Sequence, residues 1–298
     1  MKIDKKRFDT IGTELISWYK TNRRKFSWRK KIRDPYEVLV CEVMGQQTQA
    51  SRIEEFLPRF LSKFPNANAL AKAKKAEIIK EWQGLGHNRR ALNLHRAATE
   101  LSGKNFPRTE DELLNLPGVG DYTARAILIF AFNKPIVTVD VNIERVLSRL
   151  YKKMPNQDAM LPKKQVYQIA EKILPIRNSR LWHEALMDFG ATICTKRNPK
   201  CDKCPLSQNC KSRGVLQSKT TVLSSEKKYF GHPKRIWRGK VLKLLISPHK
   251  THETHIINTL QNSFPPKEFR HFIKQILKEL TREGFCEKKN NIYQMHQG

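Results

Sequence analysis

Four cysteines near the middle of the chain have a spacing that indicates metal chemistry. Cys194, Cys201, Cys204 and Cys210 follow the pattern C-x6-C-x2-C-x5-C within one short segment. Four thiolates in a compact loop can enclose a metal centre, and thiolates select zinc or iron–sulfur clusters. Because most structural zinc sites use paired C-x2-C knuckles, the spacing favours a 4Fe–4S cluster over a zinc site or a disulfide-paired loop.

A second motif, LNLPGVGDYTARAILIF at 114–130, predicts two helices joined by a tight turn. Gly118 and Gly120 allow the backbone to turn sharply and to approach a partner closely. The free amide groups that open the second helix form an anion site suited to a DNA phosphate. The motif therefore predicts a helix-hairpin-helix, although a purely structural hairpin would use a similar turn.

A third candidate is Asp140, which lies twenty residues after Gly120 and just before the amphipathic stretch VNIERVLSRL. Taken alone, an aspartate at this position is most simply the N-cap of a helix. The order of the motifs changes that interpretation. A hairpin, then this aspartate, then the cysteine pattern is a highly specific combination.

Charge indicates the class of partner. The 298 residues include 57 Lys and Arg against 28 Asp and Glu, a formal net charge of +29. An excess of this size favours nucleic acid, because phosphate neutralisation releases counterions. No apolar run approaches the roughly 20 residues of a membrane helix, and the charged N-terminus lacks an apolar signal core. We therefore expect an intracellular, cytoplasmic or nucleoid-associated protein that binds no membrane.

The elements that must position these motifs are helical up to about residue 211. Residues 213–231 are polar and predict a linker. After it come three further helices and two short strands around 288–291, an order typical of a winged helix, with a plain helical accessory domain as the alternative. Helices are predicted at 6–22, 35–48, 50–63, 67–73, 75–82, 87–102, 110–116, 121–132, 141–153, 163–174 and 180–190.

In these motifs the sequence resembles the helix-hairpin-helix DNA glycosylases that carry an iron–sulfur loop, and most of all the MutY-type adenine DNA glycosylases. The resemblance covers residues 7–212. It implies a two-lobed core, with a six-helix lobe at about 22–132 and an iron–sulfur lobe built from the N-terminal helix and about 133–212. The small winged-helix-like domain would occupy 232–298. The matching segments are FSWRK, DPYEVLVCEVMGQQTQ, WQGLG, LPGVGDYTA, VDVNIERVLSRL and HEALMDFGATIC.

The resemblance also implies roles for single residues. Glu42 matches the catalytic glutamate of the family, and Tyr122 stands where bifunctional relatives carry a Schiff-base lysine. Without that amine nucleophile we expect little or no lyase activity. Asp140 would stabilise the sugar cation, with Asn142 and Tyr122 positioning it. The expected reaction removes adenine mispaired with 8-oxoguanine or guanine and leaves an abasic site.

Local chemistry supports different tasks for the two carboxylates. In a helix, Glu42 lies beside an apolar stripe that includes Val38, Leu39 and Val43, and desolvation raises the pKa of a carboxyl group. Asp140 lies at a helix N-terminus, where the positive end of the dipole favours the ionised form. An acid paired with an anion is the arrangement used to break glycosidic bonds.

The resemblance further implies a set of DNA contacts. Arg29 and Glu184 would line the adenine pocket, and the GQQT and GLGH segments would contact or wedge beside the opposite purine. The hairpin would bind the phosphate backbone. The residues assigned to base or DNA contacts are Arg29, Gln46, Gln47, Thr48, Leu85, His87, Gly118, Val119, Gly120, Thr123 and Glu184.

Two departures from the family lie outside the catalytic motifs. His87 replaces the usual intercalating tyrosine, and residues 230–298 are too few for the Nudix-like domain that many MutY-type proteins carry. The basic run KKYFGHPKRIWRGK could bind DNA, or the domain could dock a protein partner. We expect a monomer. The alternative functions are a thymine/uracil–guanine mismatch glycosylase and a non-catalytic iron–sulfur DNA-binding protein.

Overall fold

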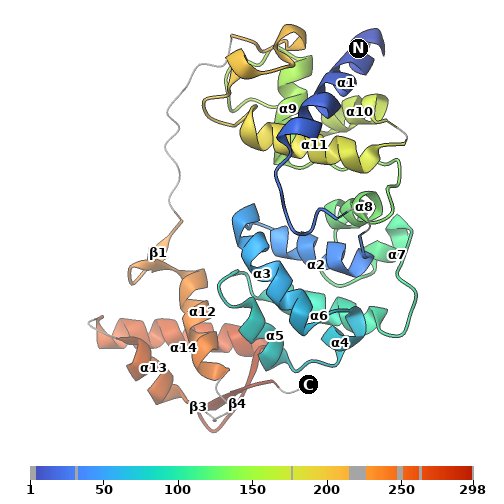
Figure 1. Cartoon of the computed structure of the whole chain (residues 1–298). Coiled ribbons are helices and arrows are strands. Elements are labelled where there is room, and N and C mark those ends of the chain that lie inside the picture. The colour runs from blue at the N-terminus through green and yellow to red at the C-terminus, as the bar shows by residue number, and fades with distance from the viewer. Residues whose placement is uncertain are drawn as a thin grey trace. The chain divides into compact units, whose positions relative to one another are not determined.

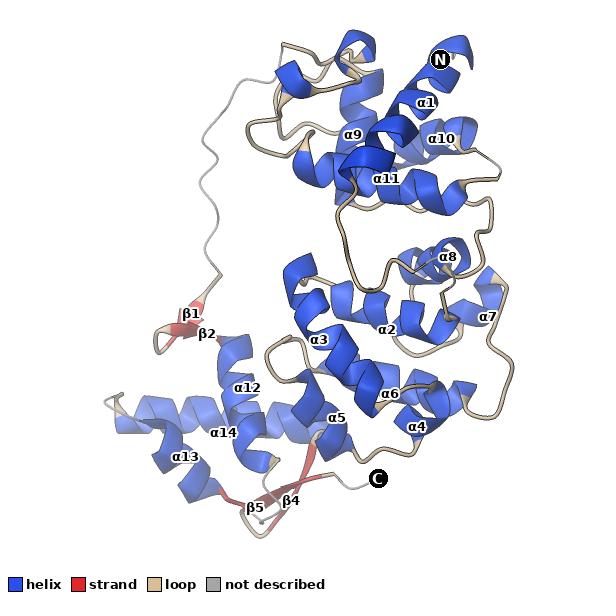
Figure 2. Ribbon diagram, viewed as in Figure 1, coloured by secondary structure: helices blue, strands red, loops and turns tan. Residues whose placement is uncertain are grey.

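The structure is a computed structural model that describes residues 5–30, 33–175, 177–214, 226–246, 251–261 and 264–296 (Figure 1). The chain forms two compact units. The first unit comprises Met1–Val38, Pro107–Leu114 and Val119–Val222, and the second comprises Leu39–Phe106, Asn115–Gly118 and Leu223–Gly298. Helices dominate both units, and the described strands all follow residue 227 (Figure 2). The predicted mainly α-helical fold with a small C-terminal sheet is confirmed.

The first unit is built around helix α11 (Ser179–Thr192), which packs against α1 (Lys5–Asn22) and α9 (Val141–Tyr151). Their shared core includes the buried side chains of Leu15, Ile143 and Phe189. Both polar segments of interest, the start of α9 and the loop after α11, are therefore anchored on one hydrophobic cluster. The other helical elements are α7 (Glu110–Leu114), α8 (Asp121–Phe130), α10 (Lys163–Ile173) and the 3-10 turns η1 (Cys201–Lys203) and η2 (Ser207–Asn209).

The second unit takes up helix α2 (Pro35–Gly45) from Leu39 onward. Its core includes the fully buried rings of Phe60 and Trp82, whose centroids lie 5.7 Å apart in an edge-on arrangement. Two rings in this geometry stabilise the fold by more than the burial of their apolar surface alone. The remaining helices of this part are α3 (Ala50–Lys63), α4 (Ala67–Ala71), α5 (Lys75–Trp82) and α6 (Arg89–Leu101).

The C-terminal part contains the three predicted helices and the predicted hairpin, with Trp237 and Phe269 packed edge to face in its core. The strands of one sheet run in the order β3-β5-β4, and all its pairs are antiparallel. Asn290 and Asn291 turn the β4–β5 hairpin with φ of 49° and 61°, as a two-residue type I′ turn requires. The elements are β1 (Lys228–Tyr229), β2 (His232–Pro233), α12 (Lys234–Leu245), β3 (Thr251–His252), α13 (Glu253–Gln261), α14 (Pro266–Arg282), β4 (Cys286–Lys289) and β5 (Ile292–Met295).

Several predicted helix ends differ from the structure by two or three residues, and two of them lie at predicted contact residues. Helix α2 ends at Gly45 instead of residue 48, and α6 begins at Arg89 instead of residue 87. Gln47 and His87 have φ of 56° and 45°, in the left-handed region that a right-handed helix excludes.

The predicted linker at 213–231 is described only at its two ends. Residues 215–225 lie outside the described residues, and Lys228–Tyr229 form β1 instead of an extended connection. No helix in the described ranges is both long and apolar enough to cross a membrane.

Candidate active site and DNA contacts

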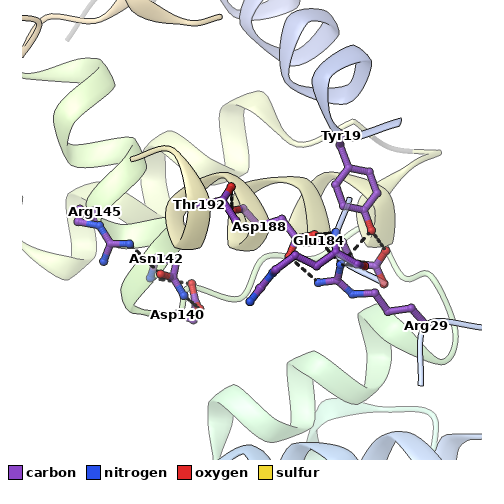
Figure 3. A network of polar contacts seen from close by, with 9 residues as sticks. Tyr19, Arg29, Asp140, Asn142, Arg145, Glu184, Asp188 and Thr192 are labelled. Carbon is purple, nitrogen blue, oxygen red and sulfur yellow. Dashed lines mark hydrogen bonds and ion pairs between the residues drawn. The ribbon is translucent and has the colours of Figure 1, made fainter. Parts of the chain in front are cut away.

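The carboxylate of Asp140 caps the N-terminus of α9. Its Oδ1 accepts hydrogen bonds from the backbone N–H groups of Asn142 at 2.9 Å and Ile143 at 2.7 Å. Its Oδ2 accepts a third from the Asn142 side-chain amide at 2.8 Å (Figure 3). Three N–H donors and the positive end of the helix dipole stabilise a negative charge at this position. The structural role as N-cap and the expected role as an anion are therefore compatible.

A chain of hydrogen bonds fixes Asn142 in turn. Its Oδ1 accepts from Nη2 of Arg145 at 2.7 Å, and the same guanidinium donates to the Gly190 carbonyl at 2.7 Å and to the Cys194 carbonyl at 2.8 Å. A Cβ on Gly190 would lie 2.7 Å from that of Asn142, so glycine permits the close approach of α9 and α11. The Asp140 site is thus coupled to the first cysteine of the loop, through an arginine that we did not single out from the sequence.

Glu42 lies in α2 among buried neighbours. Leu39 and Val43 are 0% and 3% exposed, whereas Glu42 itself is half-buried. The apolar surroundings predicted from the helical spacing are present. Glu42 belongs to the second unit and Asp140 to the first. Tyr122 is half-buried in the first turn of α8, in the first unit.

The hairpin turn depends on Gly118. Its φ is +81°, and an added Cβ would lie 2.7 Å from the Cβ of Asn93. Gly120 then precedes α8 with extended backbone and accepts the first helical hydrogen bond, from Ala124. Val119 and Thr123 are 7% and 4% exposed, so their side chains pack inside and do not face a phosphate.

The guanidinium of Arg90 joins the two turns whose backbones are strained. Strain of this kind costs on the order of 1–3 kcal/mol per residue and persists where the surroundings enforce it. Arg90 is 9% exposed, and burial lowers its pKa to about 10, which leaves it charged at neutral pH. The side chains of Gln47 and His87 are exposed on these two turns, whereas the side chain of Leu85 is buried at 7% exposure. Arg90 donates to the carbonyl groups of Val43, Met44, Gln46, Leu85 and Gly86 and to the Thr48 hydroxyl.

Arg29, assigned to the adenine pocket, forms a bidentate ion pair with Asp188. The two N···O distances are 2.6 and 2.9 Å (Figure 3). Arg24 approaches the same carboxylate at 2.6 Å. Burial alone would raise the pKa of Asp188, but the hydrogen bonds and charges of Arg29 and Arg24 outweigh it and hold the pKa below its usual value. Asp188 was missed in the sequence, where its only signal is a carboxylate inside the apolar run of α11.

Glu184, the other residue assigned to the adenine pocket, lies one helical turn before Asp188. It accepts a 2.7 Å hydrogen bond from the Tyr19 hydroxyl and forms an ion pair with Arg33. It is 6% exposed, so both partners are needed to compensate the buried charge. The structure therefore brings Arg29 and Glu184 together in one polar network of the first unit.

The buried imidazole of His183 holds the segment that leads into Asp140. Its Nδ1 lies 2.7 Å from the Ser179 carbonyl oxygen, and its Nε2 lies 3.2 Å from the Thr138 backbone nitrogen. Nδ1–H therefore donates, and Nε2 accepts. Burial lowers the pKa of His183 to about 4. Protonation of Nε2 would also place its N–H group against the Thr138 backbone N–H group, and the hydrogen bond between them would be lost.

This arrangement predicts a pH-dependent stability. Because the folded pKa lies below the unfolded value of about 6.5, His183 stabilises the fold above that pH, and the contribution is lost as the pH falls toward 4. We expect the free energy of unfolding to drop by about 3 kcal/mol across this window. Urea titrations should show a flatter pH profile for His183→Asn, whereas His271→Asn, at an exposed site, should keep the wild-type profile. Equal profiles for all three proteins would contradict the assignment.

The four cysteines of the loop line one small cavity together with Arg149 and Arg213. All four are free thiols, and burial raises the pKa of Cys204 to about 12. Within the described residues, no three His, Cys, Asp or Glu side chains form a group that could hold a metal ion as they stand. The enclosed thiols thus provide four sulfur donors around one cavity.

Arg149 supports this loop from α9. It is 1% exposed and donates to the carbonyl groups of Thr195 at 2.7 Å and Lys196 at 3.1 Å, with Nη1 3.5 Å from the Cys194 sulfur. Four sulfur donors in one cavity, with a buried cation beside them, fit a thiolate-bound metal centre that carries net negative charge.

Comparisons with known proteins identify the family. Residues 40–175 match the family described as HhH-GPD superfamily base excision DNA repair protein. An adenine DNA glycosylase of Mycolicibacterium smegmatis is 37% identical over 235 residues, which cover 78% of this chain and 79% of that protein. A thymine/uracil-DNA glycosylase of Methanothermobacter thermautotrophicus is 36% identical over 70% of this chain and 94% of its own length.

A solved structure agrees with these relatives. A thermostable thymine-DNA glycosylase superposes with a TM-score of 0.63 and 32% identity, covering 70% of this chain and 97% of the other. The chain spans only 57% to 65% of three further bacterial adenine DNA glycosylases. The similarity to the Mycolicibacterium smegmatis enzyme, in contrast, extends over most of both chains. The chain therefore belongs to the HhH-GPD superfamily of base excision DNA repair proteins, and its glycosylase core is of the MutY type.

Proposed function

We propose that the protein hydrolyses the N-glycosidic bond of adenine mispaired with 8-oxoguanine or guanine in double-stranded DNA. The similarity to adenine DNA glycosylases supports the reaction class. The observation that carries the proposal is the geometry of Asp140, whose carboxylate is held by three N–H donors at the start of α9. A fixed anion of this kind can stabilise the positive charge that develops on the sugar when the bond to the base breaks.

In the proposed mechanism the target nucleotide is flipped out of the duplex. Glu42 protonates adenine at N7, which weakens the bond to C1′ of the sugar. Asp140 stabilises the oxocarbenium-like sugar, with Asn142 and Tyr122 positioning it. Glu42 then accepts a proton from the water that completes hydrolysis. Because position 122 is a tyrosine and offers no amine nucleophile, the abasic site is released without strand cleavage.

The residues assigned to DNA contacts keep those roles as part of the proposal. Gln47 and His87 would meet the purine opposite adenine, since both are exposed on strained turns that Arg90 holds in place. Arg29 and Glu184 would border the adenine pocket from the polar network. Leu85 can act as a wedge only if it leaves its buried position.

A second candidate substrate is thymine or uracil opposite guanine. The likeness to a thymine/uracil-DNA glycosylase and to a solved thymine-DNA glycosylase favours it. Single-turnover assays on A:8-oxoG, A:G, T:G and U:G duplexes separate the candidates. We expect adenine release opposite 8-oxoguanine to be fastest. Faster release of thymine or uracil would reverse the assignment, and no release from any duplex would favour a non-catalytic DNA-binding protein.

Cys194, Cys201, Cys204 and Cys210 would hold a 4Fe–4S cluster in this proposal. Their shared cavity and the buried Arg149 support it. When bound, the cluster would cross-link the loop between η1, η2 and the end of α11, and it takes part in no step of the reaction. An anaerobic preparation should contain about four irons per chain, and Cys204→Ser should lose most of them. One zinc per chain would contradict the cluster.

Domain organisation completes the proposal. Residues 1–212 would form the glycosylase core and 232–298 a separate winged-helix-like domain, since the latter has its own aromatic core around Trp237 and Phe269. We expect the protein to bind and repair DNA as a monomer. We expect it to be located in the compartment that holds the DNA.

A further inference from the structure

Helix α14 carries a stripe of basic residues along its exposed face. Lys267, Arg270, Lys274, Lys278 and Arg282 recur every three or four residues, and all five are exposed. This spacing places them on one side of a helix. The opposite side is apolar and buried, with Phe269, Phe272, Ile273, Ile276, Leu277 and Leu280 facing the core.

The basic run at the start of the C-terminal part, residues 227–240, is by contrast partly neutralised, since three of its six basic side chains form ion pairs. Lys234 forms an ion pair with Glu279 at 2.6 Å, and Arg238 forms one with Glu283 at 2.7 Å. Arg235 lies 3.0 Å from Glu226. These acidic partners neutralise half of the charge that the run would otherwise offer to a phosphate.

The stripe keeps most of its charge available. Among the described residues, no ion pair engages Lys267, Arg270, Lys278 or Arg282. Lys274 is paired with Glu253 at 3.0 Å. Ion pairs within the folded domain therefore engage three of the five basic side chains of α12 but only one of the five in the α14 stripe, a distribution that is invisible in the composition.

The β4–β5 hairpin, hereafter the wing, continues the same basic surface. Lys288 and Lys289 are exposed on β4, and Lys288 lies 3.6 Å from Glu253. Glu253 is 8% exposed and also accepts a hydrogen bond from the Tyr293 hydroxyl. Through its two lysine partners this carboxylate ties the wing to α14. A groove of about 800 Å³ runs between them, and its lining includes Lys274, Lys278, Arg282 and Lys288 together with the carboxylates of Glu253 and Glu279.

We propose that α14 and the wing form a second DNA-binding surface, which contacts duplex DNA separately from the catalytic core. A helix is about 10–12 Å across with its side chains, and the major groove is about 12 Å wide. The stripe from Lys267 to Arg282 extends over roughly 22 Å of helix, enough to face several phosphates. As the second helix of the pair α13–α14, α14 has the position of a recognition helix. This surface increases the affinity for duplex DNA and positions the enzyme on it, but it does not recognise the mispair.

The test measures binding of the full-length protein to an undamaged 20-bp duplex by fluorescence anisotropy at 50–300 mM salt. In the variant Arg270→Ala/Lys278→Ala/Lys289→Ala we expect about tenfold weaker binding at the lowest salt. The slope of log Kobs against log salt should become less negative by about 2–3, close to 0.9 per lost phosphate contact. Because no base is released from this duplex, the result does not depend on the proposed glycosylase reaction.

A matched control removes the same amount of charge from exposed positions outside the α14 stripe and the wing. Lys227→Ala/Lys228→Ala/Lys243→Ala should keep the wild-type slope within about half a unit, since one slope unit corresponds to about one phosphate contact. Thermal melts of both triple variants should match the wild type, because every substituted side chain is exposed. A wild-type slope in the α14 variant, or an equal loss of slope in both variants, would overturn the proposal. The first of these outcomes would assign the surface to an acidic protein partner instead of DNA.

Discussion

Replacing Glu42 by glutamine is expected to lower the single-turnover rate of adenine release by about a thousandfold. The substitution keeps the size and polarity of the side chain but removes the acidic proton, and general acid catalysis contributes about 10²–10⁴ to such rates. Asp140→Asn should cause a loss of similar size, because a neutral amide cannot stabilise the sugar cation. The measurement is the rate at saturating enzyme on an A:8-oxoG duplex.

Glu37→Gln is the matched control for this prediction. Glu37 lies on the same helix α2, in an exposed ion pair with Lys30, and takes no part in the proposed chemistry. Its loss should leave the rate within about twofold, since exposed pairs contribute on the order of 0–1 kcal/mol. If either Glu42→Gln or Asp140→Asn retains more than about 5% of the rate, the assigned roles are wrong, because general acid catalysis by itself contributes at least about a hundredfold.

Asp188→Asn is expected to reduce the free energy of unfolding by about 3–5 kcal/mol. The side chain is fully buried and compensates the charges of Arg24 and Arg29, so the amide leaves two cations without a counter-charge. Urea denaturation of the first unit measures the effect. Glu171→Gln, on the exposed face of α10, makes the same change of carboxylate to amide and should stay within about 0.5 kcal/mol of wild type.

The pH dependence gives Asp188 a second, independent test. Its pKa in the folded protein lies below its usual value, so the carboxylate contributes stability above an unfolded pKa of about 3.9, and the contribution is lost as the pH falls. Wild type should therefore lose stability more steeply below about pH 4 than Asp188→Asn. Parallel acid profiles, or a variant as stable as wild type at pH 7, would show that the two arginines find compensation elsewhere.

The catalytic motifs were predictable because each depends on local chemistry. The N-cap position of Asp140 follows from an aspartate before an amphipathic helix, and the hairpin follows from Pro117 and Gly118 between two helices. The cavity lined by four cysteines follows from their close spacing in the chain. In each case the interacting groups are separated by few residues, so residue type and spacing carry most of the information.

The end of α2 and the start of α6 were not predicted correctly, because helix propensity does not indicate where the backbone is strained. The positive φ angles of Gln47 and His87 end one helix early and start another late. Neither residue is a glycine, and nothing in the local pattern marks the turn. The arginine that holds both turns, Arg90, bonds to carbonyl groups more than forty residues away in the chain.

The sequence by itself determined the helical class, the order of the motifs and the family to which they point. Only the tertiary structure decided which charges are compensated. Arg24 meets Asp188 across 164 residues, and Lys234 meets Glu279 across 45. Ion pairing depends on distance in space, which the fold sets after the chain has packed its apolar faces. For that reason half of the basic run seen in the sequence is neutralised, whereas most of the basic side chains along α14 stay unpaired among the described residues.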